Sequence, residues 1–349
     1  MPQSSRLAHT PLSVLDLAPI RQGRTITQTF QETLDLAQHA EAWRYKRYWL
    51  AEHHNLASVA CSATSVLIGY VAQGTSTIRV GSGGIMLPNH APLVIAEQFG
   101  TLESLYPGRI DLGLGRAPGT DYPTMRALRR DLRNEDNFPE LLDELRELFA
   151  APKPGQTVRA LPGAGLNVPI WLLGSSGFSA QLAGHLGLPF AFAGHFMPEN
   201  TLPALDIYRR SFQPSEVLDH PYTMVGVPVL AADTDAEAQH LSTTEYINVL
   251  RLIRNQLAPL SPPVESVEGL ANPFEQAAIE SKRAAAIVGG PETVRRKLEA
   301  FLEETQADEL IITSNPYEHA DRLHSYEIVA EIAKQATREA EQSQLTAVE

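Results

Sequence analysis

The sequence predicts an α/β protein built as a (β/α)8 barrel, the TIM-barrel fold, with a helical insertion after the seventh strand. Short apolar segments alternate with longer amphipathic ones along the chain, which is typical of parallel strands joined by helices. Eight such units favour a closed barrel over an open, doubly wound sheet. The segment 236–286 is too long for one barrel helix and contains a cluster of helix breakers at 257–263, which indicates the insertion.

The predicted strands are short apolar segments, as expected for strands that are buried on both faces of a parallel sheet. In chain order they cover 12–17, 48–51, 78–85, 110–114, 169–173, 189–193, 223–230 and 309–313. The predicted helices follow amphipathic patterns and cover 29–43, 58–73, 92–105, 137–149, 178–186, 201–212 and 292–304. The eighth unit is recognisable because a loop with proline near a helix start, 289–293, precedes the last helix and its compact final strand.

We expect a single domain, 1–349, whose core covers about 10–336 and whose insertion covers about 236–286. The tail after about Ala336 is polar, so we expect it to fray.

Composition excludes several classes of protein. A formal charge of -13 and a pI near 5.3 disfavour a nucleic-acid partner, because such binding depends on clustered Lys and Arg. No apolar stretch approaches the ~20 residues of a membrane span, and the first ten residues do not resemble a signal peptide, so a cytoplasmic enzyme is expected. Cys61 is the only cysteine, which rules out internal disulfides and metal sites with several thiolates.

The most informative segment is Glu52-His53-His54-Asn55, which follows the second predicted strand directly. In a barrel the carboxyl ends of all strands meet at one end, and enzymes of this fold carry their active sites there. The spacing disfavours a metal, because adjacent histidines on a strand point to opposite faces. One imidazole facing the site would act as a general acid or base, while the other would bond to Glu52 or the backbone. For either histidine alone, a structural role is the stronger reading.

Further candidates end the other strands. Gly83-Gly84 after the third strand permits a bulge or an unusual, even cis, peptide, although a plain bend is at least as good a reading. The segment Gly174-Ser175-Ser176-Gly177-Phe178-Ser179 lies between a strand and a helix, where backbone N–H groups and hydroxyls can bind a phosphate; a glycine turn with a serine N-cap is an equal alternative.

Arginine and histidine follow two of the other predicted strands. Arg116, after the fourth strand, could pair with the same phosphate, and His90 and His195 are weaker candidates near strand ends. The segment 113–119 is not a dinucleotide fingerprint, because Pro118 occupies the third glycine position.

Together these segments resemble the bacterial luciferase-like superfamily of flavin-dependent monooxygenases. The resemblance spans nearly the whole chain in order, and it is carried by YWLAEHHN (48–55), GSGGIMLPNHAP (81–92), AEQF (96–99), PGRIDLGLGRAPG (107–119), LGSSG (173–177) and ADEL (307–310). The resemblance implies a barrel with an insertion after strand seven, usually dimeric, that binds reduced FMN at the carboxyl ends of its strands.

By position, the resemblance assigns roles to several residues. His53 resembles the histidine beside the reactive flavin edge, with Glu52 and His54 as its neighbours. Gly83 and Gly84 match a non-prolyl cis peptide under the isoalloxazine. Phosphate contacts are implied for Arg116, Ser176 and Ser179, and the remaining cofactor-binding candidates are Gly174, Ser175, Gly177, Phe178 and His195.

Two departures from bacterial luciferase itself matter. Gly115 stands where bacterial luciferase has a reactive cysteine and Ser175 where it has a glutamate, so the resemblance does not extend to light emission or to a long-chain aldehyde substrate.

The leading hypothesis is therefore a monooxygenase in which reduced FMN and O2 form a flavin C4a-hydroperoxide that oxygenates a small organic substrate. A separate flavin reductase would supply the reduced FMN, since no nicotinamide site is evident, and we expect a homodimer without a bound metal. Two alternatives stay open: a deazaflavin-dependent oxidoreductase that transfers hydride without O2, and a flavin-binding paralogue without catalysis.

Overall fold

The computed structural model describes residues 5–130 and 137–346, and it confirms the (β/α)8 barrel. The barrel strands are all parallel; each pairs with the next along the chain and the last returns to the first, which closes the sheet. They are β1 (Leu12–Asp16), β2 (Arg47–Leu50), β3 (Arg79–Met86), β4 (Ile110–Gly115), β5 (Ile170–Gly174), β6 (Phe190–Phe192), β7 (Thr223–Ala231) and β9 (Glu309–Thr313). The predicted strands agree with these bounds to within one residue at either end.

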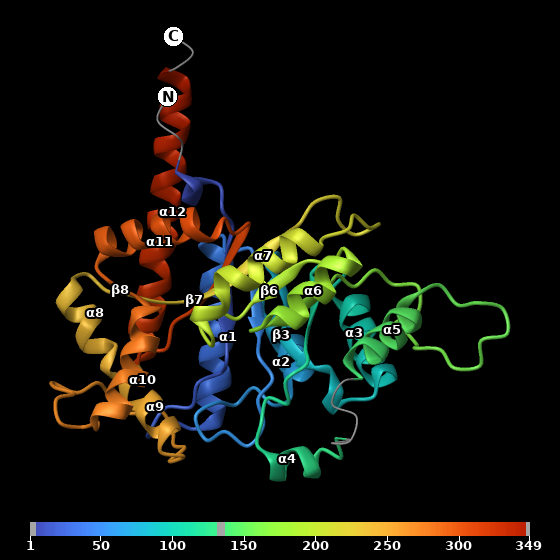
Figure 1. Ribbon diagram of the computed structural model, residues 1–349, viewed down its shortest axis with the longest axis horizontal. Helices are drawn as coiled ribbons and strands as arrows, with labels where there is room; N and C mark the ends of the chain where they lie inside the picture. The colour runs from blue at the N-terminus through green and yellow to red at the C-terminus, as the bar shows by residue number, and fades with distance from the viewer. Residues whose placement is uncertain (1–4, 131–136, 347–349) are drawn as a thin grey trace.

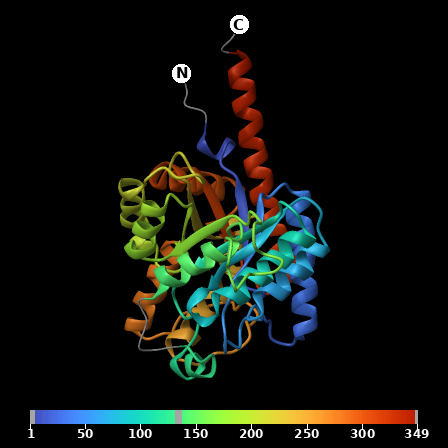
Figure 2. The same cartoon turned by 90° about the vertical axis from the view of Figure 1, so that its right-hand side faces the viewer.

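Helices connect the strands and cover the outside of the barrel (Figures 1 and 2). Those that follow the barrel strands are α1 (Ile26–Ala42), α2 (Thr64–Gln73), α3 (Pro92–Leu105), α4 (Tyr122–Ala127), α5 (Phe138–Phe149), α6 (Gly177–Leu186), α7 (Thr201–Ser211), α11 (Pro291–Thr305) and α12 (His319–Thr346). Local sequence fixes several of their ends. Thr25 begins α1 through a capping box with Gln28, and Gly187 ends α6 in the left-handed conformation that favours glycine.

Helix α2 begins at Thr64, so the prediction of a helix from residue 58 is wrong. Residues 58–60 instead pair with the loop after β1: Ile20 N donates to Ser58 O at 2.8 Å, and Ala60 N donates to Ala18 O at 2.9 Å. This pairing connects segments about forty residues apart and keeps 58–60 out of the helix, which a local pattern cannot reveal.

Three helices follow β7: α8 (Asp235–Leu241), α9 (Thr243–Ile253) and α10 (Pro273–Ala284). A short strand after them, β8 (Ile287–Gly289), pairs with the end of β7 and was not predicted. The insertion is attached to the loop after β1, because Leu260 N donates to Ile20 O and Gln22 N donates to Leu260 O, both at 2.8 Å. Figure 1 shows α9 and α10 near the end of the barrel that lies opposite the two chain termini.

The C-terminal segment differs from the prediction that the tail frays, since α12 continues to Thr346. Its later turns are held by specific contacts: Ala336 and Ala340 are buried, Thr337 Oγ1 donates to Ala8 O at 3.0 Å, and Glu339 pairs with Arg295. Figure 1 shows this helix running along the barrel and extending past its amino end. No helix of the described ranges has both the length and the apolar character required to span a membrane.

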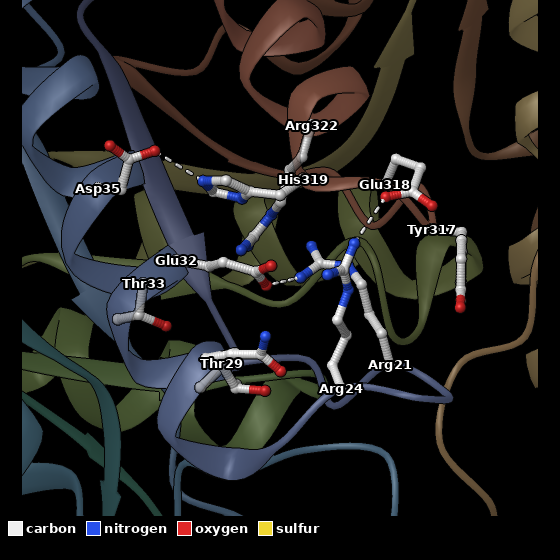
Figure 3. Close-up of polar contacts among 12 residues, drawn as sticks. Arg21, Arg24, Thr29, Glu32, Thr33, Asp35, Tyr317, Glu318, His319 and Arg322 are labelled. Atoms are coloured by element: carbon white, nitrogen blue, oxygen red, sulfur yellow. Dashed lines mark hydrogen bonds and ion pairs between the residues drawn. The ribbon is translucent and has the colours of Figure 1, made fainter.

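Polar side chains connect the first unit of the barrel to the start of α12 (Figure 3). Arg24 Nη2 lies 3.2 Å from Glu318 Oε2, and His319 Nε2 lies 2.7 Å from Asp35 Oδ2. Because α1 and α12 flank the seam at which the barrel closes, these contacts help to hold the first and last units together.

Asp16, at the carboxyl end of β1, belongs to a buried cluster rather than to an open site. It accepts hydrogen bonds from Arg322 Nη2 at 2.8 Å, from Tyr48 Oη at 2.6 Å and from Thr33 Oγ1 at 2.8 Å. Burial opposes ionisation of this carboxyl, but the charge of Arg322 and the hydrogen bonds outweigh it and lower the pKa of Asp16. Asp16 is therefore an ionised structural anchor.

Candidate active site

The candidate residues lie at the carboxyl ends of β2 to β6, an end of the barrel that we call the mouth. The five strands are consecutive neighbours in the closed sheet, so their ends form one continuous arc. Residues from positions 52 to 195 thereby reach the same end of the molecule, as the barrel prediction required.

Glu52 is the centre of a hydrogen-bond network at the end of β2. Its carboxylate receives His54 Nε2 at 2.9 Å, His90 Nε2 at 2.9 and 3.0 Å, Met86 N at 2.9 Å and Asn89 Nδ2 at 3.3 Å. Its side chain is only 1% exposed. Burial opposes the charge, yet these donors, His90 first, outweigh it and lower the pKa of Glu52. These contacts favour a positioning role, in which Glu52 ties the end of β2 to the turn after β3.

His53 is half-buried and lies beside the loop that follows β4. Burial lowers its pKa, while the Gly119 carbonyl and Glu52 act weakly in the opposite direction, so the imidazole is neutral near pH 7. Gly119 has φ +64, and a Cβ there would lie 2.8 Å from the Glu52 carbonyl oxygen. Only glycine permits this close approach, which fixes the environment of His53.

The Gly83–Gly84 peptide bond is cis, and the pairing of β3 with β4 shifts register between Ser82 and Ile85. The sequence permitted either a bulge or a cis peptide at Gly83-Gly84, and the structure has both a cis peptide and a register shift there. A Cβ on Gly84 would lie 2.8 Å from the Gly113 carbonyl oxygen, and one on Gly83 would lie 2.7 Å from the Leu15 side chain. Gly84 thus allows β3 and β4 to approach closely at the mouth, and Gly83 leaves room for the Leu15 side chain of β1.

The start of α6 presents groups that can bind an anion. Ser176 is the N-cap and is exposed, and within the described part of the chain its side chain makes no capping hydrogen bond. The hydroxyl and the first N–H groups of α6 are therefore available, at the positive end of the helix dipole. Arg116, from the loop after β4, lies over the Phe178 ring with its guanidinium carbon 4.3 Å from the ring centroid. This places a cation beside the same helix start.

Two other predicted residues of this segment have supporting contacts. Ser175 O accepts a hydrogen bond from Asn200 Nδ2 at 3.2 Å. Ser179 is buried against Gly174, where a Cβ would lie 2.6 Å from the Ser179 Cβ. Gly174 and Ser179 therefore shape the turn from β5 into α6, and Gly177 begins the helix.

His195 follows β6 and packs against Gly226 of β7, where an added Cβ would lie 2.5 Å from His195 Nδ1. That nitrogen is buried and has no hydrogen-bond partner among the residues that the structure describes. Burial lowers the pKa of His195 to about 4, with smaller contributions from His53 and Lys282. His195 is therefore neutral, and it lies within electrostatic range of both of those side chains.

The sequence did not single out Asn89, Glu245 or Lys282, and it gave His90 little weight. Asn89 and His90 follow β3 by only a few residues, so their position at a strand end was the available signal. Glu245 and Lys282 lie on helices of the insertion, where sequence alone does not tell which face turns toward the mouth.

A cavity of ≈ 680 Å³ lies at the opposite end, among the amino ends of β2 to β6. Arg47, which lines this cavity, is held in ion pairs: its Nη1 lies 2.7 Å from Asp111 Oδ2, and its Nε lies 2.9 Å from the buried Glu309 Oε1. In β/α barrels, residues at the amino ends of the strands usually contribute to stability, whereas active sites lie at the carboxyl ends. We therefore place the active site at the mouth. Among the described residues, no group of three or more His, Cys, Asp or Glu side chains could hold a metal ion.

Comparison with known proteins adds independent evidence. A family model described as luciferase-like monooxygenase matches residues 10–309. The chain is 49% identical to a luciferase-like monooxygenase of Escherichia coli strain K12, with 93% of this chain and 97% of that protein covered. It is 33% identical to the N-acetyl-S-alkylcysteine monooxygenase of Bacillus subtilis, with 94% and 99% covered. Among solved structures, it resembles apo-MsnO8 with a TM-score of 0.86 and 37% identity, with 93% and 99% covered.

Proposed function

Because this chain belongs to the luciferase-like monooxygenase family, we propose that it is a monooxygenase that uses reduced FMN and O2 to oxygenate a small organic substrate. The choice of cofactor rests on the common location of three features at one end of the barrel. They are the start of α6 with Arg116, the close glycine contact between β3 and β4, and the neutral His53.

The residues at the mouth fit FMN by their chemistry. Ser176, the first N–H groups of α6 and Arg116 would hold the phosphate, which carries negative charge. Gly83 and Gly84, which are joined by a cis peptide, would present backbone of β3 to a flat ring at the mouth. When bound, reduced FMN supplies two electrons to O2, so that one oxygen atom enters the substrate and the other leaves as water.

The protein would contribute proton handling and positioning. His53 is neutral near pH 7, so it can accept a proton at the reacting edge of the cofactor and return it to the departing oxygen. Glu52 and His54 hold this segment through the network at the end of β2. We assign His53 the catalytic role and Glu52 and His54 positioning roles.

Two partners belong to the proposal. A separate flavin reductase would supply reduced FMN, because the 113–119 segment lacks the dinucleotide fingerprint. A second copy of the chain would cover the apolar side chains that α2 and α3 expose, of which Val66 is 70% and Leu105 is 62% exposed. Light scattering of the purified protein would test the homodimer.

The test of function uses anaerobic titration with reduced FMN, followed by addition of isotopically labelled O2 and a substrate. The thioether N-acetyl-S-benzylcysteine is a suitable first substrate, given the name of the Bacillus subtilis relative. We expect micromolar binding of reduced FMN and transfer of one labelled oxygen atom to the sulfur. His53→Ala should lose most of this transfer, whereas His220→Ala, an exposed histidine before β7, should not.

Other results would identify the alternatives. Failure to bind reduced FMN would overturn the proposal, and turnover with a deazaflavin and no incorporation of labelled oxygen would indicate the hydride-transfer enzyme. Binding of FMN without turnover of any thioether, sulfonate or ketone would favour a non-catalytic flavin-binding protein.

A further inference from the structure

The insertion brings a lysine to the mouth beside the end of β6. Lys282 lies on α10, and its Nζ is 3.4 Å from the Phe196 carbonyl oxygen and 5.4 Å from the centroid of the Phe196 ring. Phe196 follows directly after His195. A cation from the insertion is thereby held against the strand end that also carries the buried imidazole.

Lys282 has no acidic partner. Across residues 5–130 and 137–346, no carboxylate lies within the 4.0 Å that defines an ion pair with its Nζ. Other cations of the insertion are engaged: Arg254 pairs with Glu275 at 2.7 Å, and Arg283 donates to Gln239 at 3.1 Å. An ammonium has three donors, and the long bond to the Phe196 carbonyl uses only one of them, so donors remain that an anion could accept.

The groups around Lys282 do not cancel its charge. His195 is neutral, because burial and nearby positive charge lower its pKa to about 4. Glu245, on α9, is the nearest acidic influence; burial raises its pKa to about 7, against opposing effects of Asn248 and Lys282. The Glu245 side chain is exposed, and Asn248 Nδ2 lies 3.5 Å from its Oε1, so Glu245 is not fixed against Lys282 in an ion pair within the described residues.

The phosphate of a bound flavin does not explain this lysine. The groups that suit a phosphate lie at the ends of β4 and β5, whereas Lys282 contacts Phe196, which follows β6. His195 is influenced electrostatically by both His53 and Lys282, so the proposed reacting centre and the lysine both lie near this imidazole. A small molecule with its anionic group at Lys282 would extend along His195 toward His53.

We propose that Lys282 binds an anionic group of the substrate, and that the substrate is a small organic carboxylate with an apolar reacting end. Phe196, which is 59% exposed, supplies an aromatic surface next to the ammonium for the apolar part. The proposal rests on the proposed function for the position of the reacting centre, but it can be tested by binding alone.

The experiment measures equilibrium binding of N-acetyl-S-benzylcysteine and of its uncharged primary amide, without O2, to the full chain with and without FMN. The wild-type protein should prefer the acid, since a charge-assisted hydrogen bond changes affinity by roughly 10-fold to 100-fold. Lys282→Met should weaken binding of the acid by that factor and leave the amide within about two-fold. Lys282→Arg should retain most of the preference.

Arg283→Met is the matched control, because it removes the same charge from the adjacent residue of α10, and it should leave the preference for the acid intact. Equal affinity of the wild type for acid and amide, no binding of the acid, or an unchanged preference in Lys282→Met would each overturn the proposal. A parallel loss of FMN affinity in Lys282→Met would overturn it as well, because the lysine would then serve the cofactor. A protein that binds the acid through Lys282 but not reduced FMN would refute the proposed function alone.

Discussion

Replacing Glu52 by Gln tests whether the carboxylate at the end of β2 positions the site. The change keeps the size of the side chain but replaces one acceptor oxygen by an NH2 group. Glu52 Oε1 faces His54, His90 and Asn89, while Oε2 faces the Met86 N–H and also lies 3.0 Å from His90 Nε2. In the best orientation, Gln keeps the bond from Met86 and turns its NH2 toward the other three groups.

The expected loss follows from this count. The hydrogen bond from Asn89 disappears and its amide is left facing another donor, which costs about 1–3 kcal/mol. Either imidazole can change tautomer and accept from the new NH2, so no further loss is counted. Glu52→Gln should therefore lower the free energy of unfolding by about 1–3 kcal/mol.

Urea denaturation of the flavin-free protein, followed by tryptophan fluorescence, measures this loss. Glu216→Gln, at an exposed position, is the control and should change stability by less than about 0.5 kcal/mol. Because the pKa of Glu52 is lowered by folding, its contribution is full above about pH 4.3 and is lost as the pH falls through the lower folded value. The difference between wild type and Glu52→Gln should shrink over that acid range.

A variant as stable as the wild type, or a stability difference that persists at acid pH, would refute the network as described. Loss of turnover without loss of stability would instead assign Glu52 a direct part in the chemistry.

Three further predictions concern the anchor of the barrel and the cofactor. Asp16→Asn leaves the buried Arg322 without its carboxylate, so it should lower the free energy of unfolding by about 3–5 kcal/mol in urea, and an unchanged midpoint would contradict the buried pair. Gly84→Ala places a methyl group 2.8 Å from the Gly113 carbonyl oxygen, so fluorescence titration should show weaker FMN binding, with about 1–3 kcal/mol of stability lost; wild-type values would disprove the close contact. Arg116→Met should weaken FMN roughly 10-fold to 100-fold but leave riboflavin, which lacks the phosphate, unaffected; equal effects on both ligands would place the phosphate elsewhere.

The barrel strands were predictable to within one residue because each is short, apolar and buried on both faces, a pattern that is local in sequence. The start of α2 was not predictable from the sequence, because residues 58–60 pair with the loop after β1. The last turns of α12 were missed for a similar reason: contacts to Ala8 and Arg295 stabilise a segment that looks merely polar. β8 is only three residues long and depends on the end of β7.

For the candidate site, the identity of several residues was predictable from the sequence, but their roles were not. Glu52, His53, Gly83 and Arg116 could be predicted as candidates from the sequence, because each lies at the end of an apolar strand. Which of them handle protons and which hold others in place depends on partners from other units. Glu52 receives groups from the turn after β3, more than thirty residues away, so its role as the centre of a network was invisible in the sequence.

By itself, the sequence determined the barrel, the end at which its chemistry lies and the family resemblance, because all three depend on periodicity and on which residues follow each strand. Only the tertiary structure decided the environment of each group. It buries Asp16 against Arg322, keeps His195 neutral and brings Lys282 from the insertion to the mouth, where it forms no ion pair with any residue of 5–130 or 137–346. Burial, pKa and unpaired charge arise from contacts between distant segments, which the local order of residues does not specify.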